Sequence, residues 1–268
     1  MKTYFIVSDV HGFYFELKKA LKEAGFNKNN PGHFLIVCGD AFDRGHRAID
    51  VFNFLNYMNK HGRLIYIRGN HEDLLLKLID ILIKKEYIEY YHISNGTLDT
   101  ISQFTEISVT DLLTHNYDSI VLKNKLQPLI LFINTNTLDY YELNNYIFVH
   151  GWVPYILHDG HCSDQKEGEF SCVMTPEVEL NAATFMWEHA RWENGMQAWH
   201  MGVKIPNKTI VCGHWHTSFG NYKYHHVGSG EFTEDSCYEP FIDDGIIALD
   251  ACTAYTKKVN VYKIDVKN

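Results

Sequence analysis

The chain has 268 residues, of which 46% are hydrophobic; this length and composition allow a globular domain with an ordinary core and exclude a disordered chain. Its formal net charge of −9 counts against stable nucleic-acid binding, which relies on a basic surface, but not against a phosphorylated substrate. A strand is expected directly after Thr3, which leaves no room for a signal segment, and no apolar run approaches the roughly 20 residues that span a bilayer, so we expect a cytoplasmic protein that does not bind membranes.

Residues 3–71 alternate between short apolar runs and amphipathic segments. The apolar runs predict buried strands that end at Val7, Cys38 and Ile67. The amphipathic segments predict helices over residues 14–24, 48–59 and 72–85. This alternation is typical of an α/β fold, in which ligands bind at the carboxyl ends of the strands.

The remainder of the chain is less regular, and we expect one domain over residues 1–268. Residues 87–135 predict a helical insert, with helix starts near Thr97 and Thr110. A long polar loop is expected over residues 155–180, where it could overhang a site. The last predicted elements are a helix over 179–193 and an antiparallel second sheet built from the runs 225–227, 245–250 and 259–264.

The six cysteines include no CxxC pair, so a zinc site held by thiolates is not expected. Cys38 and Cys212 end apolar runs and are expected to be buried. Cys162 and Cys172 lie in the polar loop and could pair, although a cytosolic compartment disfavours a disulfide.

Five short clusters of metal- or phosphate-binding residue types follow apolar, strand-like runs. They are Ser8-Asp9-Val10-His11-Gly12, Gly39-Asp40-Ala41-Phe42-Asp43-Arg44-Gly45, Gly69-Asn70-His71-Glu72, His150-Gly151 and Gly213-His214-Trp215-His216. Because ligands at the carboxyl ends of strands meet at one edge of a sheet, we expect the clusters to converge. Each cluster alone has an ordinary structural explanation, such as a turn or a helix N-cap, but five in order indicate a site.

The residue types suit a centre of two divalent metal ions. Asp40 can give one carboxylate oxygen to each ion, while Asp9 and His11 are spaced to face one of them. Asn70, His150 and His214 supply neutral ligands for the other. This mixture of carboxylate, amide and imidazole favours manganese, with iron or zinc as alternatives. Two such ions, about 3.5–4 Å apart, would acidify a bridging water and stabilise a phosphoryl group during displacement.

Three further residues fit phosphoryl chemistry. His71 follows Asn70 directly, so its side chain points away from the metals and can act as the general acid toward a leaving group. Asp43 would orient that imidazole and raise its proton affinity. Arg44 carries a planar guanidinium suited to two phosphate oxygens. Glu72 is expected to cap the following helix and not to act in catalysis.

The order DxHG, GDxxDRG, GNHE, HG and GHxH resembles the calcineurin-like metallophosphoesterases. GDAFDRG with GNHE is similar to the phosphoprotein phosphatase branch, which includes protein Ser/Thr phosphatases, phage-type phosphatases and symmetric diadenosine tetraphosphate hydrolases. The resemblance implies an α/β fold with a two-sheet β-sandwich flanked by helices and a dinuclear metal site at the strand ends. It is dense over residues 5–72 and returns at His150 and at 214–216.

The resemblance also implies roles for individual residues. The first metal would be held by Asp9, His11 and Asp40, and the second by Asp40, Asn70, His150 and His214. GHxH in the wider superfamily implies His216 as a further ligand, and related bacterial enzymes imply Arg191, after Trp187, beside Arg44 and Asn70 at the phosphate. Two departures are Ser8, where the branch has glycine, and Trp152, where protein phosphatases have a second glycine.

These features predict a metal-dependent phosphoester hydrolase. A phosphomonoesterase acting on phosphoserine and phosphothreonine proteins is the first expectation, hydrolysis of dinucleoside tetraphosphates the second and a phosphodiesterase the third. Trp152, Trp187, Trp192 and Trp199 could stack a nucleobase, although aromatic residues at such spacings are more often core. A catalytically dead scaffold is not expected because every ligand is retained. The sequence does not indicate an oligomeric state.

Overall fold

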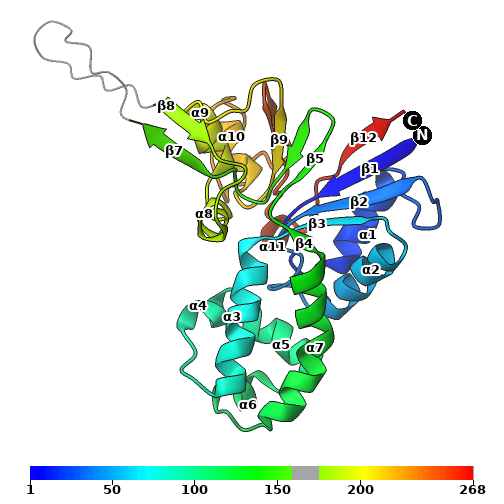
Figure 1. The fold of residues 1–268 in the computed structure, drawn as a ribbon, viewed down its shortest axis with the longest axis vertical. Helices are drawn as coiled ribbons and strands as arrows, with labels where there is room; N and C mark the ends of the chain where they lie inside the picture. Colours follow the sequence, from blue (N-terminus) through cyan, green and yellow to red (C-terminus); the bar gives the residue numbers. More distant parts are fainter. Residues whose placement is uncertain (159–174, 268) are drawn as a thin grey trace, which may run out of the picture.

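The computed structural model of this chain describes residues 1–158 and 175–267 (Figure 1). Its first sheet has the strand order β12-β1-β2-β3-β4. The strands are β1 (Lys2–Val7), β2 (His33–Cys38), β3 (Leu64–Ile67), β4 (Thr137–Leu138) and β12 (Tyr262–Val266). β1 to β4 are parallel, and β12 pairs antiparallel with β1. The helices α1 (Tyr14–Glu23) and α2 (Ala48–Lys60) connect the first three strands, as the alternating sequence predicts.

The second sheet has the order β10-β11-β9-β6-β5. Its strands are β5 (Tyr141–Leu143), β6 (Tyr146–Phe148), β9 (Thr209–Cys212), β10 (Phe241–Asp243) and β11 (Ile246–Ala248). The expectation of an antiparallel sheet is wrong for its centre, because β6, β9 and β11 run parallel and only the edge strands are antiparallel. Long crossovers, which parallel strands require, join these three strands. Residues 225–227 are not a strand, and the run from 259 contributes β12 to the first sheet.

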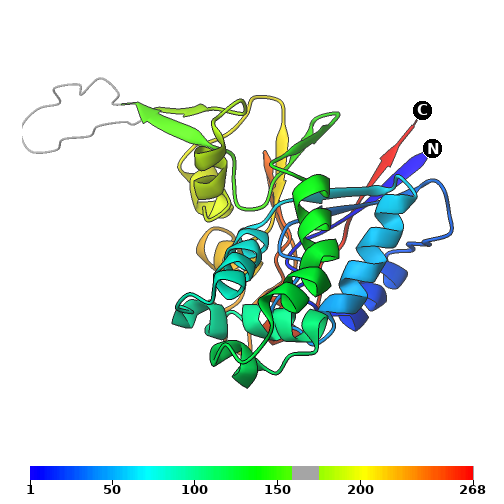
Figure 2. The same ribbon diagram turned by 60° about the horizontal axis from the view of Figure 1, so that its bottom comes forward.

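Side-chain alternation along the strands produces two packed layers. Phe5 and Val7 of β1 face a core formed with α1, α2 and the helices that follow. Tyr4 and Ile6 face the opposite way, into a core shared with strands β6, β9 and β11 of the second sheet. A third core lies on the outer face of the second sheet. The fold is therefore the expected α/β two-sheet sandwich flanked by helices; α1, α2 and α7 lie together on one side of the first sheet (Figure 2).

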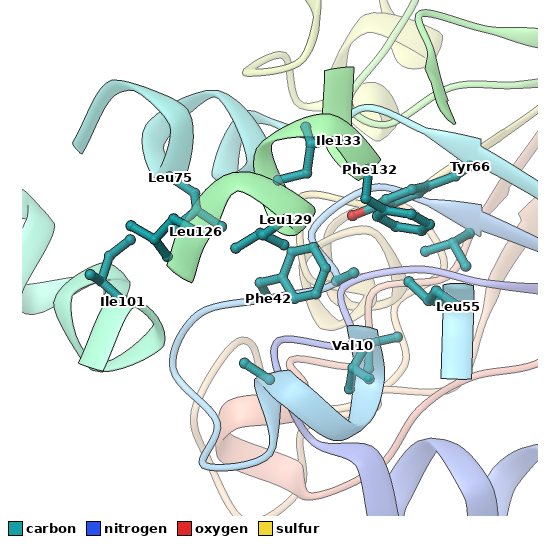
Figure 3. Packing of buried hydrophobic residues seen from close by; sticks show 14 of the residues in the cluster. Val10, Phe42, Leu55, Tyr66, Leu75, Ile101, Leu126, Leu129, Phe132 and Ile133 are labelled. Atoms are coloured by element: carbon teal, nitrogen blue, oxygen red, sulfur yellow. The ribbon is translucent and has the colours of Figure 1, made fainter. Parts of the chain in front are cut away.

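A helical lobe follows the first three strands. It consists of α3 (Asn70–Lys84), α4 (Tyr90–Ser94), α5 (Thr97–Thr105), α6 (Val109–Leu113) and α7 (Ser119–Asn136). α5 begins at the predicted residue, and α6 begins one residue before the prediction. Figure 3 shows Leu126 and Leu129 of α7 beside Leu75 and Phe42, so the lobe packs directly on the loop that follows β2.

The segment expected to be a long loop has a regular base. β7 (Tyr155–His158) pairs antiparallel with β8 (Thr175–Val178). Residues 159–174, which include Cys162 and Cys172, lie outside the described part of the chain. No helix among the described residues is long and apolar enough to cross a membrane.

Short helices complete the fold. The helix expected over 179–193 is only α8 (Thr184–Ala190). A separate helix, α9 (Gly195–His200), follows Asn194, whose side chain caps it by accepting the Gln197 N–H. α10 (Thr217–Lys223) follows the GHWH cluster, and α11 (Thr253–Thr256) precedes β12.

Candidate metal centre

The five polar clusters converge where the carboxyl ends of the two sheets meet. The His11 N–H donates to the carbonyl of Asp40 at 2.9 Å, and the Gly213 N–H donates to the carbonyl of His150 at 2.7 Å. Asp9 Oδ2 accepts the backbone N–H of His214 at 3.0 Å, although the two residues are 205 positions apart. Hydrogen bonds thus join the loops within each sheet and across the sandwich.

Asp40 lies at the centre of this site. Its Oδ1 is 3.3 Å from His150 Nε2, and its Oδ2 is 3.9 Å from both His11 Nε2 and His71 Nε2. Two ligand atoms on one metal ion, at bond lengths of about 2.0–2.2 Å, lie roughly 3–4 Å apart. Two groups of metal-binding side chains consequently share this carboxylate. They are His11-Asp40-His71 and Asp40-His150-His214.

The ring of His150 faces several acceptors at once. Its Nδ1 lies 2.8 Å from the carbonyl of Cys38, which fixes the proton on that nitrogen. Its Nε2 then faces Asn70 Oδ1 at 2.8 Å as well as the Asp40 carboxylate. Burial alone would lower the pKa of His150, but the Asp40 carboxylate raises it to about 10. A cation placed between His150 Nε2, Asn70 Oδ1 and the Asp40 carboxylate would be stabilised by all three groups, so these side chains fit a divalent metal ion.

His214 is held in the tautomer that a metal ligand needs. Its Nε2 lies 3.2 Å from the carbonyl of Trp192 and carries the proton, which leaves the Nδ1 lone pair free. Burial and the neighbouring His150 lower the pKa of His214 to about 3, so the ring stays neutral at physiological pH. The tautomer of His11 is fixed in a similar way. Its Nδ1 lies 3.1 Å from the carbonyl of Phe42, and its Nε2 faces the site.

The loops that carry these side chains adopt an unusual backbone conformation. Six non-glycine residues of the site have positive φ angles, a conformation that L residues rarely adopt. They are Asp9, His11, Asp40, Asp43, Arg44 and His214. Buried apolar residues between the polar ones, such as Val10 and Phe42, pack into the core and hold the loops in place (Figure 3). Gly69 is also required, because a Cβ there would lie 2.2 Å from Asp40 Oδ1.

His71, which belongs to the first of the two metal-binding groups, forms a buried pair with Asp43. His71 Nδ1 donates to Asp43 Oδ2 at 2.8 Å, and both side chains are almost fully buried. Burial alone would lower the pKa of His71, but the carboxylates of Asp40 and Asp43 raise it. The guanidinium of Arg44 lies 3.0 Å from His11 Nε2 and 3.1 Å from His71 Nε2. A positive group therefore lies next to the same imidazole nitrogens that face Asp40.

Two residues expected at the site have other partners. His216 Nδ1 lies 3.1 Å from Glu231 Oε1, its Nε2 is 3.9 Å from Asp250 Oδ2, and it belongs to neither metal-binding group. Arg191 is 4% exposed, and its two terminal nitrogens bond to carboxylates, one to Asp73 at 2.7 Å and the other to Asp139. Arg191 does not lie on a solvated helix face, because its side chain is buried.

Three further residues support the site through contacts that the sequence alone does not predict. Glu72 caps α3 as expected, but its carboxylate also accepts the N–H groups of Asp40 and Ala41. Asp250 is buried near Asp9, and burial together with the Asp250 charge raises the pKa of Asp9 well above its ordinary value. Thr97 donates a hydrogen bond to Asp43 from the helical lobe. Since each role depends on tertiary contacts, no local spacing could have revealed it.

The tryptophans separate into core residues and exposed residues. Trp152 and Trp187 are buried, and Trp199 donates its indole N–H to the carbonyl of Asp244. Trp192, in contrast, is 51% exposed and Trp215 is 38% exposed. Both indoles flank His214, with ring centroids 5.9 Å and 6.1 Å from the imidazole centroid. Of the four tryptophans considered from the sequence, only Trp192 thus combines exposure with proximity to the site.

Comparison with known families decides the classification. The profile of the calcineurin-like phosphoesterase family matches residues 2–218 of this chain. The chain belongs to this family. The calcineurin-like phosphoesterases are dinuclear metal-dependent hydrolases, and the family resemblance expected from the motifs is confirmed.

Individual relatives carry two kinds of names. The chain is 32% identical over 83 residues, 29% of its length, to an asymmetrical bis(5′-nucleosyl)-tetraphosphatase of Bacillus subtilis, of which the match covers 34%. It is 38% identical over 91 residues, 34% of its length, to a symmetrical bis(5′-nucleosyl)-tetraphosphatase of Buchnera aphidicola, of which the match covers 31%. It is 34% identical over 97 residues, 32% of its length, to Shewanella-like protein phosphatase 1 of Plasmodium berghei, of which the match covers 27%. The chain thus matches only about a third of the length of these relatives.

The solved structures to which the chain is similar include a putative diadenosine tetraphosphatase, with 14% identity and a TM-score of 0.44; the match covers 100% of this chain and 95% of that one. A cold-active protein-tyrosine phosphatase of a psychrophilic Shewanella has 13% identity and a TM-score of 0.48, and covers 99% of this chain and 76% of that one.

Proposed function

We propose that this phosphoesterase cleaves phosphate esters or anhydrides at two metal ions that share Asp40. The geometry of the Asp40 carboxylate supports this proposal, because its two oxygens face two separate groups of metal-binding side chains. We assign His11 and Asp9 to one ion and Asn70, His150 and His214 to the other. His216 is the least supported ligand, since its nitrogens face Glu231 and Asp250.

The chain's own residues would then act on the leaving group. Two divalent cations bound at Asp40 would supply an acidified water and neutralise phosphoryl charge. His71 Nε2, on the side of the ring that faces Asp40, would give its proton to the leaving-group oxygen as the P–O bond breaks. Asp43 accepts a hydrogen bond from the Nδ1–H of the same ring and stabilises the charged imidazole. Arg44 is near enough to bind phosphate oxygens in place of the imidazole nitrogens it now contacts.

We propose manganese as the metal, with iron or zinc as alternatives, because the donors are carboxylate and amide oxygens together with imidazole nitrogens. Soft thiolate ligands are absent from both groups in the described part of the chain. Elemental analysis of the purified protein, followed by reconstitution with each metal in turn, tests this assignment.

Three substrate classes follow from the sequence, namely phosphoserine or phosphothreonine proteins, dinucleoside tetraphosphates and phosphodiesters. The exposed indoles of Trp192 and Trp215 beside His214 favour the nucleotide, because aromatic faces at a phosphate site can stack bases. Glu193, next to Trp192, lines a pocket of about 430 Å³ together with Phe185 and Met186, which is large enough for a nucleoside. The names of the bis(5′-nucleosyl)-tetraphosphatase relatives support the same ranking.

The test compares the first two classes on one preparation. The protein is stripped of metal, reconstituted with manganese and supplied with diadenosine tetraphosphate or a phosphoserine peptide. We expect faster cleavage of the nucleotide, and the products (two diphosphates, or a triphosphate and a monophosphate) identify the bond attacked. Faster release of phosphate from the peptide would reverse the ranking, and turnover of neither substrate with any of the three metals would contradict the proposed function.

A further inference from the structure

Helix α5 of the helical lobe presents a row of polar side chains to the loop that carries Asp43. The row consists of Thr97, Thr100 and Gln103, which are spaced three residues apart and so lie along one side of the helix. Thr97 and Thr100 are fully buried. Because a buried polar group is costly without a partner, a row of three on a packed helix indicates specific hydrogen bonds.

Two of these residues hold Asp43 at both its backbone and its side chain. The Asp43 N–H donates to Thr100 Oγ1 at 3.0 Å. Thr97 Oγ1 donates to Asp43 Oδ2 at 3.0 Å, and the same oxygen accepts the Nδ1 proton of His71 at 2.8 Å. In the part of the chain that the structure describes, Asp43 Oδ1 has no partner. Asp43 Oδ2 therefore accepts two hydrogen bonds, one from His71 and one from the Thr97 hydroxyl, and together they fix the carboxylate beside His71.

Gln103 holds the far end of the same loop. Its Nε2 donates to the carbonyl of Gly45 at 3.0 Å, and its Oε1 accepts the N–H of Ala48 at 2.9 Å. The start of α5 also touches the loop directly, because a Cβ at Gly96 would lie 2.7 Å from Arg44 N. The loop is thus held by the helix from residue 43 to residue 48.

The loop needs such support because its backbone is strained. Asp43 and Arg44 have φ angles of +70° and +59°, and non-glycine residues keep this conformation only where their surroundings determine it. Relaxation of the loop toward an ordinary conformation would move the Asp43 carboxylate away from His71. The contacts with α5 oppose that movement.

We infer that Thr97 is a positioning residue for the reaction, acting through Asp43 on the orientation of His71, and that Thr100 and Gln103 hold the loop in which Asp43 lies. This inference rests on the proposed function, in which His71 protonates the leaving group. Helix α5, which carries no metal-binding motif, then contributes to catalysis through Asp43 and His71. Loss of the Thr97 hydroxyl leaves the metal ligands in place and impairs only the proton transfer.

The test replaces Thr97 by valine, which has nearly the same shape but no hydroxyl. Proton donation matters most for a poor leaving group, so we expect kcat for phenyl phosphate to fall by about tenfold or more, with a much smaller fall for p-nitrophenyl phosphate and an unchanged KM. Thr97→Ser restores the donor and should recover most of the rate. Thr105→Val is the matched control, because Thr105 is equally buried on α5 but its hydroxyl bonds only to the backbone of Ile101 and Ile107, away from Asp43.

A double-mutant cycle separates positioning from general destabilisation. In an Asp43→Asn background, Thr97→Val should have little further effect on kcat, because Thr97 acts through the Asp43 carboxylate. Metal content and melting temperature are measured for each variant, and Thr97→Ala replaces Thr97→Val if valine prevents folding. An equal loss for both leaving groups, or additive losses in the cycle, would overturn the inference. Absence of metal-dependent hydrolysis in the wild-type protein would instead refute the proposed function.

Discussion

Glu72 and Asp40 are joined by a buried hydrogen bond in which the Asp40 N–H donates to Glu72 Oε2 at 2.9 Å. The Glu72 carboxylate also accepts the N–H of Gly69 at 2.8 Å, the N–H of Ala41 at 3.0 Å and the hydroxyl of Tyr66 at 2.7 Å. A residue expected only to cap α3 thus connects the start of that helix to the loop of the central carboxylate.

All four partners of Glu72 are donors, so Glu72→Gln should be strongly destabilising despite its small change in shape. The amide NH₂ would face two donors, and each buried donor left without an acceptor costs roughly 1–3 kcal/mol. We expect the free energy of unfolding of the metal-free protein to fall by about 2–4 kcal/mol in urea denaturation. Glu86→Gln, at an exposed position, is the control. An unchanged midpoint would show that the loop does not depend on Glu72.

Asp40→Asn should abolish metal binding and hydrolysis together. The amide can offer its oxygen to one ion only, and the substitution removes the negative charge that neutralises both ions. We expect a loss of stabilisation of several kcal/mol, which corresponds to at least about a thousandfold in rate. Elemental analysis and hydrolysis assays on the same sample measure both effects. Asp99→Asn changes an exposed carboxylate of α5 and should leave both unaltered. A fully active Asp40→Asn variant would contradict the assignment of the centre.

Asp9→Asn should stabilise the metal-free protein while weakening metal binding. Burial and the neighbouring Asp250 raise the pKa of Asp9 well above its ordinary value, so the unfolded chain releases this proton more readily. The folded state therefore loses stability as the pH rises above about 4, the ordinary carboxyl pKa, and the penalty is complete above the raised pKa. Asparagine keeps a side-chain oxygen that can accept the His214 N–H, as Asp9 Oδ2 does in the wild type.

Melting curves measured in a chelator across this pH range test the effect. We expect the Asp9→Asn variant to melt at a higher temperature than the wild type at neutral pH, with the difference shrinking toward acid. With manganese present, the order should reverse. A variant that melts lower than the wild type at every pH without metal would disprove repulsion between Asp9 and Asp250.

Arg191→Met should lower stability and leave substrate affinity unchanged. Methionine keeps much of the apolar volume but leaves Asp73 and Asp139 without this partner. Because those carboxylates are 29% and 39% exposed, and Arg68 also bonds to Asp73, water compensates part of the loss and we expect about 1–3 kcal/mol. KM is measured at a temperature where the variant is folded. A large rise in KM with little change in stability would restore Arg191 to the phosphate site.

Trp192→Ala and Trp215→Ala should each discriminate between the two substrates. Stacking of a base on an aromatic side chain contributes about 1–3 kcal/mol, so KM for diadenosine tetraphosphate should rise by about tenfold, while KM for a phosphoserine peptide stays within about twofold. Tyr87→Ala removes a highly exposed aromatic ring from the helical lobe and serves as the control. Equal effects on both substrates would remove the argument for a nucleotide.

The sequence was informative wherever structure is local. The apolar runs before Asp9, Asp40 and Asn70 predict the parallel strands, and the spacing of the ligands predicts which residues converge. It was uninformative about partners far apart in the chain. Three-residue strands such as Ile246–Ala248 do not indicate their neighbours, and nothing near Tyr262 shows that β12 pairs with β1.

The same limit explains the residues that were assigned differently or not at all. His216 has the spacing of a ligand, but its ring faces Glu231 because of how the loop after α10 folds back. Arg191 lies near a tryptophan as in related enzymes, but Asp139, which sequence spacing does not place beside it, bonds to its guanidinium. Thr97 has no motif around it, and its role depends on the packing of α5 against the loop of Asp43.

The hydrogen bond between His214 and Asp9 joins residues that are 205 positions apart, and the ligands proposed for the two ions are spread over the same span. During synthesis, the early residues leave the ribosome long before the later ones, and contacts of such long range form late in folding. A nascent chain that has exposed only Asp9, His11 and Asp40 therefore lacks half of the centre. On the proposed assignment, metal uptake, and with it hydrolytic activity, is restricted to molecules in which the two sheets have already assembled.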